Sequence, residues 1–221
     1  LGGVVALVNT GGNGGWGRCG AGTPADLESL HAVHVGGAYY VSQAVWPQMK
    51  AQGGGRIVFT TSSSGMLGSQ QLTAYGTAKG GVMGLLHCLS DEGRPHGILC
   101  NGVMPNAMSR LALSVSSDAL GDNPWGRQFY PAMDPVFTAG LVSFLASHAC
   151  TSSHAIYSAL GGRIGRILVG VTDGWRGGMD SPPTAEQVAE QFDLINDTSR
   201  GFVIPANLRD EFRLLAEQLA Q

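Results

Sequence analysis

Three side chains, Ser62, Tyr75 and Lys79, have the chemistry and the spacing needed to move a proton to or from an oxygen atom. Tyr75 and Lys79 are four residues apart, so on a helix they share one face. A free tyrosine has a pKa of about 10, and a neighbouring ammonium group favours the phenolate and lowers that pKa. Tyr75 can then act as general acid or base on an alcohol or carbonyl oxygen, while the Ser62 hydroxyl holds the same oxygen.

The surrounding sequence predicts the elements that position these groups. The β-branched run at 56–61 predicts a buried strand that delivers Ser62 at its carboxyl end. Residues 73–93 predict a helix that carries Tyr75 and Lys79 in its first two turns. The same tyrosine–lysine spacing also occurs on ordinary amphipathic helices, so the pair alone does not establish a catalytic site.

Several segments, in order, resemble the short-chain dehydrogenase/reductase family. Ser62 precedes Tyr75 by thirteen residues, as the family's serine precedes its tyrosine. Residues 7–12 (LVNTGG) are similar to the family's L-V-N-N-A-G, and residues 101–106 (NGVMPN) to its N-x-x-x-P-G, with Asn106 in place of the glycine. The resemblance covers residues 4–160. It implies the C-terminal part of a Rossmann-like α/β fold with a doubly wound parallel sheet.

A narrower resemblance is to the (3R)-hydroxyacyl-CoA dehydrogenase units of type 2 multifunctional enzymes and their bacterial relatives. It implies an oxidoreductase that transfers a hydride between NAD and a 3-hydroxyacyl-CoA or a similar secondary alcohol, with NADP not excluded. It also implies a homodimer or homotetramer. The segments that carry it are 33–35 (VHV), 44–49 (AVWPQM), 92–94 (EGR) and 105–110 (PNAMSR).

The resemblance assigns roles to the residues that match the family's motifs. The implied catalytic set is Ser62, Tyr75 and Lys79. The implied nucleotide contacts are Asn9, Gly11, Tyr75, Lys79, Pro105, Ala107, Met108 and Ser109, and the segment from Pro105 receives the nicotinamide carboxamide.

His34 stands where the wider family usually has an asparagine that helps hold a water in a proton relay. A helix histidine that is hydrogen-bonded to the backbone explains His34 equally well, so both interpretations stay open.

The family's G-x-x-x-G-x-G nucleotide turn has no counterpart in these 221 residues. The apolar run at 4–8 predicts a strand buried on both faces, and the resemblance places that strand in the middle of the sheet. We therefore expect the polypeptide to be longer than this sequence. We expect residues 1–180 to form the dehydrogenase domain without its first β-α units, and residues 181–221 to form a helical C-terminal extension.

Other patterns predict the remaining elements. Thr23 and the proline after it predict the start of a helix that runs to about residue 52. Residues 98–103 predict a strand, and 155–160 the last strand of the sheet. Further helices are expected at 135–146, from Thr184 and at 207–220, and the family resemblance makes 111–134 a substrate lid.

Composition narrows the classes of partner. A net charge of −3 without a basic block argues against nucleic acid, and the absence of a run of about 20 apolar residues argues against a membrane span. Four cysteines without C-x-x-C spacing indicate a reduced, cytoplasmic setting. His148, Cys150 and His154 lack a second ligand pair of matching spacing, so we predict no metal site.

Two other functions fit the same residues. A hydroxysteroid, or the CoA-linked side chain of a sterol, is an alternative substrate. The altered segment 9–12 and the missing nucleotide turn also fit a non-catalytic subunit of a dehydrogenase complex.

Overall fold

The computed structural model describes all residues except 1, 16, 110–131, 179 and 220–221. Most of the predicted substrate lid, 111–134, therefore lies outside the described residues. The chain forms two compact units, Leu1–Ile167 and Leu168–Gln221. The predicted domain boundary after residue 180 falls inside the second unit. That residues 1–180 and 181–221 are separate domains stays a prediction.

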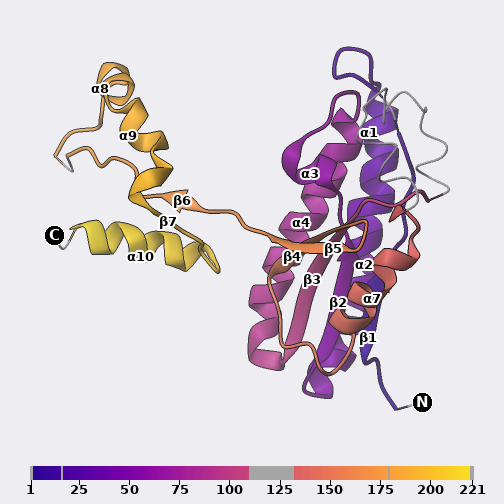
Figure 1. Ribbon diagram of the computed structural model, residues 1–221. Helices are drawn as coiled ribbons and strands as arrows, with labels where there is room; N and C mark the ends of the chain where they lie inside the picture. Colours follow the sequence, from indigo (N-terminus) through magenta and orange to yellow (C-terminus); the bar gives the residue numbers. More distant parts are fainter. Residues whose placement is uncertain (1, 16, 110–131, 179, 220–221) are drawn as a thin grey trace. The chain divides into compact units, whose positions relative to one another are not determined.

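The first unit is built on a sheet of five strands in the order β1-β2-β3-β4-β5 (Figure 1). The first four strands pair in parallel, and β5 pairs antiparallel with β4. This mostly parallel sheet confirms the predicted α/β fold class. The strands are β1 (Ala6–Asn9), β2 (Gly55–Thr60), β3 (Ile98–Pro105), β4 (Ala155–Leu160) and β5 (Arg163–Ile167).

The prediction that 155–160 is the last strand of the sheet is wrong. A two-residue turn, Gly161-Gly162, sends the chain back along β4 as β5. Both glycines have positive φ, at 56° and 79°, which matches the primed turns that join hairpin strands with the correct twist. The Gly-Gly pair was therefore the sequence signal for the extra strand.

One face of the sheet is covered by helices that the sequence predicts well. The helix predicted to run to about residue 52 is one continuous helical segment made of α1 (Pro24–His31), a π-helical turn (Ala32–Gly36) and α2 (Gly37–Ala51). Thr23 caps it in a capping box with Asp26. The predicted helix 73–93 is α4 (Thr73–Gly93), preceded by the short α3 (Ser63–Leu67) and followed by a 3-10 turn (Arg94–His96).

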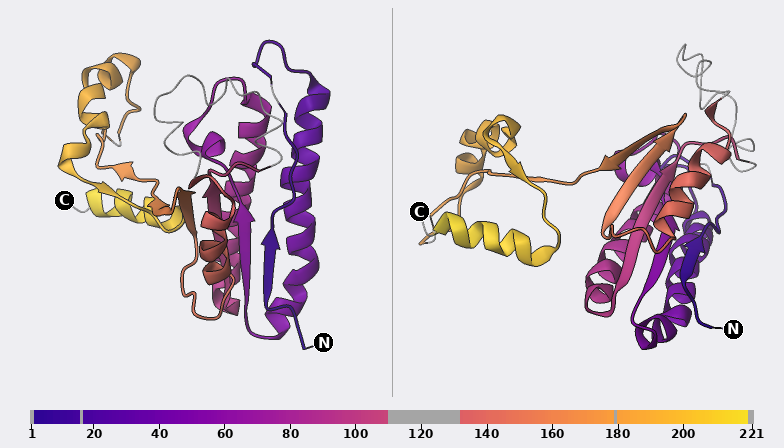
Figure 2. Two further views of the ribbon diagram at one scale, coloured as in Figure 1. Left: turned by 45° about the vertical axis from the view of Figure 1, so that its right-hand side comes forward. Right: turned by 60° about the horizontal axis from the view of Figure 1, so that its bottom comes forward.

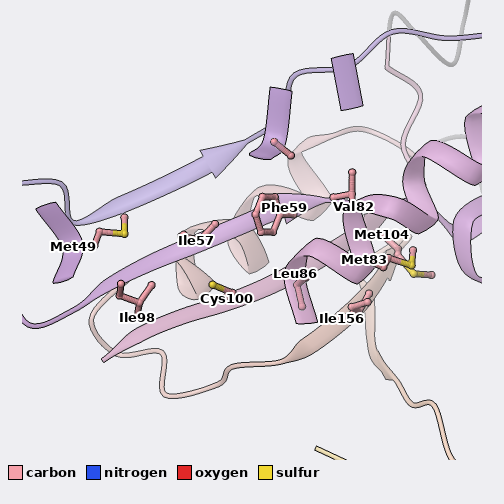
Figure 3. Packing of buried hydrophobic residues seen from close by; sticks show 11 residues of the cluster. Met49, Ile57, Phe59, Val82, Met83, Leu86, Ile98, Cys100, Met104 and Ile156 are labelled. Carbon is pink, nitrogen blue, oxygen red and sulfur yellow. The ribbon is translucent and has the colours of Figure 1, made fainter. Parts of the chain in front are cut away.

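The opposite face of the sheet packs on α7 (Val136–Leu145) (Figure 2). Strand β2 serves both layers, because successive side chains of a strand point to opposite faces. Ile57 and Phe59 belong to the cluster under α2 and α4 (Figure 3), and Val58 belongs to the cluster under α7. This burial on both faces explains the continuous apolar run of a parallel strand.

The second unit consists of short helices and one two-stranded ribbon, β6 (Val171–Thr172) with β7 (Phe202–Val203). The helix predicted from Thr184 begins with a capping box to Gln187 but is divided into two at Gln191. The helices are α8 (Ala185–Glu190), α9 (Phe192–Asn196), a 3-10 turn (Thr198–Arg200) and α10 (Leu208–Leu219). No helix in the described part of the chain is long and apolar enough to cross a membrane.

Gly65 marks the closest approach of α3 and α4. A methyl group there would lie 2.7 Å from the Gly80 nitrogen and 2.8 Å from the Lys79 carbonyl carbon. Because backbone atoms cannot yield as a side chain can, we expect Gly65→Ala to lower the free energy of unfolding by about 1–3 kcal/mol in urea titrations.

The matched control is Gly84→Ala in α4, the helix that Gly65 contacts, where a methyl group meets nothing within 4 Å. That change should leave stability unaltered or raise it by about 1 kcal/mol, because alanine favours helix. A Gly65→Ala variant as stable as Gly84→Ala would show that the α3–α4 contact is not tightly constrained.

Candidate active site

The structure places the predicted catalytic side chains at the carboxyl end of β2 and the first turns of α4. Ser62 follows β2 in an extended conformation and caps α3, where its Oγ accepts a hydrogen bond from the Ser64 N–H at 3.2 Å. Tyr75 and Lys79 lie on α4, which starts at Thr73. Their positions follow from the strand–turn–helix order that the sequence predicts.

A cavity of about 940 Å³ opens where the carboxyl ends of β1, β2 and β3 meet. Ligands in open α/β sheets bind at this edge. The cavity brings together most of the predicted site residues, but Asn9 and Met108 do not line it. Those that do are Gly11, Ser62, Tyr75, Lys79, Pro105, Ala107 and Ser109.

Lys79 is the buried cation of the site, with only 4% of its surface exposed. Its Nζ donates a hydrogen bond to the Thr60 carbonyl oxygen at 2.9 Å, and this bond ties α4 to the end of β2. Burial disfavours the charged amine and lowers the pKa of Lys79 from 10.5 to about 8. The same Nζ lies 5.7 Å from the centroid of the Tyr75 ring, within the range of a cation–π contact.

The pKa of Tyr75 moves in the opposite direction from the one we predicted. Burial raises it, and the hydrogen bond from Ser62 offsets only part of that rise. Desolvation penalises the phenolate more than the nearby polar groups stabilise it. At neutral pH Tyr75 is therefore a phenol, which has a proton to donate.

The structure shows the backbone hydrogen bond that one interpretation of His34 requires, and the relay role stays a prediction. Its ring nitrogen Nε2 lies 2.8 Å from the Asn13 carbonyl oxygen, so the backbone contact exists. The ring also lines the cavity and stands edge-on to Tyr75, with 5.4 Å between centroids. The π-helical turn at 32–36 contains this histidine, and such turns are frequent at functional sites.

The protonation of His34 follows from its partner. A carbonyl oxygen only accepts, so Nε2 carries the hydrogen, and Nδ1 is left as a bare acceptor. That Nδ1 is buried and has no hydrogen-bond partner among the described residues. Burial, and then the positive charge of Lys79, lower the pKa of His34, so its ring is neutral.

Sequence reasoning missed the parts of the site that act through backbone or shape. The Thr60 carbonyl holds Lys79, and the Asn13 carbonyl holds His34. Gly12 leaves room for the His34 ring, because a methyl group there would lie 2.8 Å from its Cε1. Helix α7 adds further lining residues, Thr138, Ala139, Val142 and Ser143. Every residue has a backbone carbonyl, so residue types do not show which carbonyl will bind a side chain. The clustered glycines at 11–15, in contrast, could have indicated a close approach at this place.

The segment after β3 is held to its neighbours by main-chain hydrogen bonds. The Asn106 N–H donates to the Ala159 carbonyl at 2.9 Å, and the Met108 N–H donates to the Met133 carbonyl at 2.7 Å. These bonds fix the course of 105–109 along the cavity. Met108 contributes its main-chain N–H to this course, and its predicted contact with the nucleotide stays a prediction.

A Rossmann-like sheet with a tyrosine and a lysine on the helix beside its carboxyl edge defines a class of oxidoreductase. A family model described as short chain dehydrogenase matches residues 1–117, and the chain belongs to the short-chain dehydrogenase/reductase family. It is 32% identical over 172 residues to a short-chain type dehydrogenase/reductase of Mycobacterium tuberculosis, covering 78% of this chain and 56% of that protein.

Other relatives are similar over a comparable part of the chain. The mouse (Mus musculus) peroxisomal multifunctional enzyme type 2 is 33% identical over 178 residues, which cover 79% of this chain and 23% of that enzyme. The chain thus spans about half, or less, of the length of these relatives.

Solved structures share the fold. The full-length peroxisomal multifunctional enzyme type 2 of Drosophila melanogaster superposes with a TM-score of 0.81 at 24% identity, covering 97% of this chain and 38% of that one. A gluconate 5-dehydrogenase of Burkholderia cenocepacia, in complex with NADP and tartrate, superposes with a TM-score of 0.66 at 28% identity, covering 73% and 65%.

Burial of Lys79 predicts how stability depends on pH. Between pH 8 and 10.5 the folded lysine loses its proton while the unfolded one keeps it, so the unfolded state binds more protons. The free energy of unfolding should therefore rise with pH through this window, relative to Lys79→Met, by up to about 3 kcal/mol. Urea titrations of both proteins across the window measure this difference, and a constant difference would contradict the lowered pKa.

Proposed function

We propose that the protein interconverts a 3-hydroxyacyl-CoA and a 3-ketoacyl-CoA, with a nicotinamide nucleotide as the hydride carrier. The observation that supports this most strongly is the convergence of Ser62, Tyr75 and Lys79 in one cavity at the carboxyl edge of a parallel sheet. Membership of the short-chain dehydrogenase/reductase family supports the oxidoreductase class.

The chain's own residues account for the proton side of this reaction. Ser62 and Tyr75 both line the cavity, so their hydroxyl groups can converge on the place where a substrate oxygen would sit. In the direction of reduction, Tyr75 donates its proton to the substrate oxygen, because burial keeps the phenol protonated at neutral pH. The Lys79 ammonium, 5.7 Å from the ring, stabilises the phenolate that this step leaves.

In the direction of oxidation the same groups work in reverse, with the Tyr75 phenolate taking the hydroxyl proton. When bound, the nicotinamide supplies or accepts the hydride at the substrate carbon. Raised pH favours this direction, since it favours the phenolate that must act as base.

The residues present fit the nicotinamide end of a nucleotide. The buried Nδ1 of His34, which has no hydrogen-bond partner in the described part of the chain, provides an acceptor in the cavity, and the Lys79 ammonium provides a donor. Lys79 and Tyr75 would hold the nicotinamide ribose, and the segment 105–109 the carboxamide. Gly11, with Asn9 beside it in sequence, would lie toward the adenosine ribose. We propose NAD as the nucleotide, and NADP, which the gluconate 5-dehydrogenase structure contains, is the alternative.

An acyl-CoA is proposed as substrate because relatives over this part of the chain are peroxisomal multifunctional enzymes of type 2. Apolar lining residues of the cavity suit an acyl chain, namely Leu72, Val103, Ala139 and Val142. A panel of 3-hydroxyacyl-CoA, hydroxysteroid and sterol side-chain CoA substrates separates the leading proposal from the steroid alternatives. A homo-oligomer and a cytoplasmic location stay predictions.

The role of Tyr75 is tested by Tyr75→Phe, which removes only the hydroxyl group. We expect kcat to fall by roughly 10²–10⁴-fold, the range typical of a lost general acid or base, while nucleotide affinity falls far less, because only the Tyr75 contact with the ribose is lost. Steady-state kinetics and nucleotide titrations measure the two effects separately.

The control is Tyr40→Phe, because Tyr40 is 68% exposed on α2 and does not line the cavity. It should have the wild-type kcat. A Tyr75→Phe enzyme that keeps most of its activity would exclude the proposed proton transfer, and a wild-type protein that turns over no substrate in the panel would favour the non-catalytic subunit.

A further inference from the structure

Two histidines join α4 to the start of β4, well outside the catalytic set. The Nδ1 of His87 lies 2.9 Å from the Nε2 of His154, and the ring centroids are 4.1 Å apart with a 45° tilt between planes. At this distance one nitrogen donates its N–H and the other accepts it, so a single hydrogen lies between the two nitrogens.

The backbone of His154 is part of the same junction. Its φ is +62°, in the left-handed region that residues other than glycine seldom adopt. The His154 N–H is shared between the Cys100 carbonyl at 2.8 Å and the Ser90 Oγ at 3.2 Å. The Ser90 hydroxyl itself donates to the Cys100 carbonyl at 3.0 Å. These hydrogen bonds therefore join Ser90 of α4, Cys100 of β3 and His154, which precedes β4.

The charges around this junction disfavour an added proton. Arg94, beyond the end of α4, and Arg166, on β5, act on His154 with positive charge, and the negative charge of Asp91 acts in the opposite sense. Asp91 is itself paired with Arg94 at 3.6 Å. Burial and then the charge of His154 lower the pKa of His87 to about 4, and burial is also the main reason that the pKa of His154 is lowered.

We propose that His87 and His154 form an acid-sensitive latch that fastens α4 to the residue entering β4 and opens when both rings are protonated. One hydrogen already lies between the facing nitrogens, so a single added proton is taken up at the outer nitrogen of the donor ring without breaking the contact. A second proton places two N–H donors against each other at 2.9 Å, inside a half-buried contact.

Opening the latch would affect the catalytic residues, because α4 and β3, which meet at this junction, also lead to the cavity. Helix α4 carries Tyr75 and Lys79 two turns or more before His87, and β3 leads from Cys100 to the cavity at Pro105. The sign of the pH effect follows from the pKa directions. The unfolded histidines take up protons near pH 6.5, whereas the folded pair resists them, so the stabilising effect is complete above pH 6.5 and is lost as the pH falls toward 4.

The test compares urea unfolding of the wild-type chain and His87→Gln at pH values from 7 down to 4.5. We expect the unfolding equilibrium constant of the wild type to rise, relative to the variant, by up to about 10-fold per pH unit below 6.5, which corresponds to one extra proton taken up on unfolding. His154→Asn is the second variant, because asparagine tolerates a left-handed backbone and should keep the chain folded.

The control is His148→Gln, which removes an exposed histidine from the same region of the chain. It should retain the acid sensitivity of the wild type, while both pair variants lose it. Amide hydrogen exchange at 87–90 and 155–157 adds a local readout, with acid-dependent opening in the wild type and His148→Gln but not in the two pair variants. Parallel pH curves for the wild type and both pair variants, or loss of the effect in His148→Gln, would overturn the proposal.

Discussion

The hydrogen bond from the buried Lys79 ammonium to the Thr60 carbonyl is the contact on which the candidate site depends. It joins the second turn of α4 to the last residue of β2, so the helix cannot shift along the strand without leaving a buried charge unpaired. Removing the partner of a buried charge is strongly destabilising. Tyr75 stands one turn before Lys79 and Ser62 stands two residues after Thr60, so one bond fixes the positions of both hydroxyl groups.

The burial that makes this bond strong also sets the chemistry of its neighbours. Desolvation lowers the pKa of Lys79 and of His34 and raises that of Tyr75, so each group is moved toward its neutral form. The cost is offset by backbone carbonyls, with Thr60 serving Lys79 and Asn13 serving His34. Small residues make this arrangement possible, because Gly65 and Gly12 leave space that a methyl group would fill.

Much of this arrangement could be predicted from sequence, and the failures have physical causes. The bounds of α4 and the approach of Ser62 to Tyr75 follow from a strand, a turn and a helix read in order, each with a strong local pattern. Strand β5 was missed because a short, half-exposed strand has too few residues for a clear alternating pattern. The Gly161-Gly162 turn was the sequence signal that indicated it. The π-helical turn at 32–36 has no pattern of its own.

The predicted direction of the Tyr75 pKa was wrong because sequence spacing shows which charges are near but not how much water is excluded. Asn9 and Met108 were assigned by motif; neither lines the cavity, and the Met108 N–H donates to the Met133 carbonyl. The direction of a pKa shift and the residues that line the cavity therefore depend on burial and main-chain hydrogen bonds, which motif spacing does not show.

The central claim is that the cavity beside Tyr75 and Lys79 binds a nicotinamide nucleotide, and titration with NADH tests it most directly. The fluorescence of the nicotinamide should change saturably as the protein is titrated, with competition by NAD and a weaker response in Lys79→Met. A protein that is folded by circular dichroism but shows no saturable change with either NADH or NADPH would contradict the account.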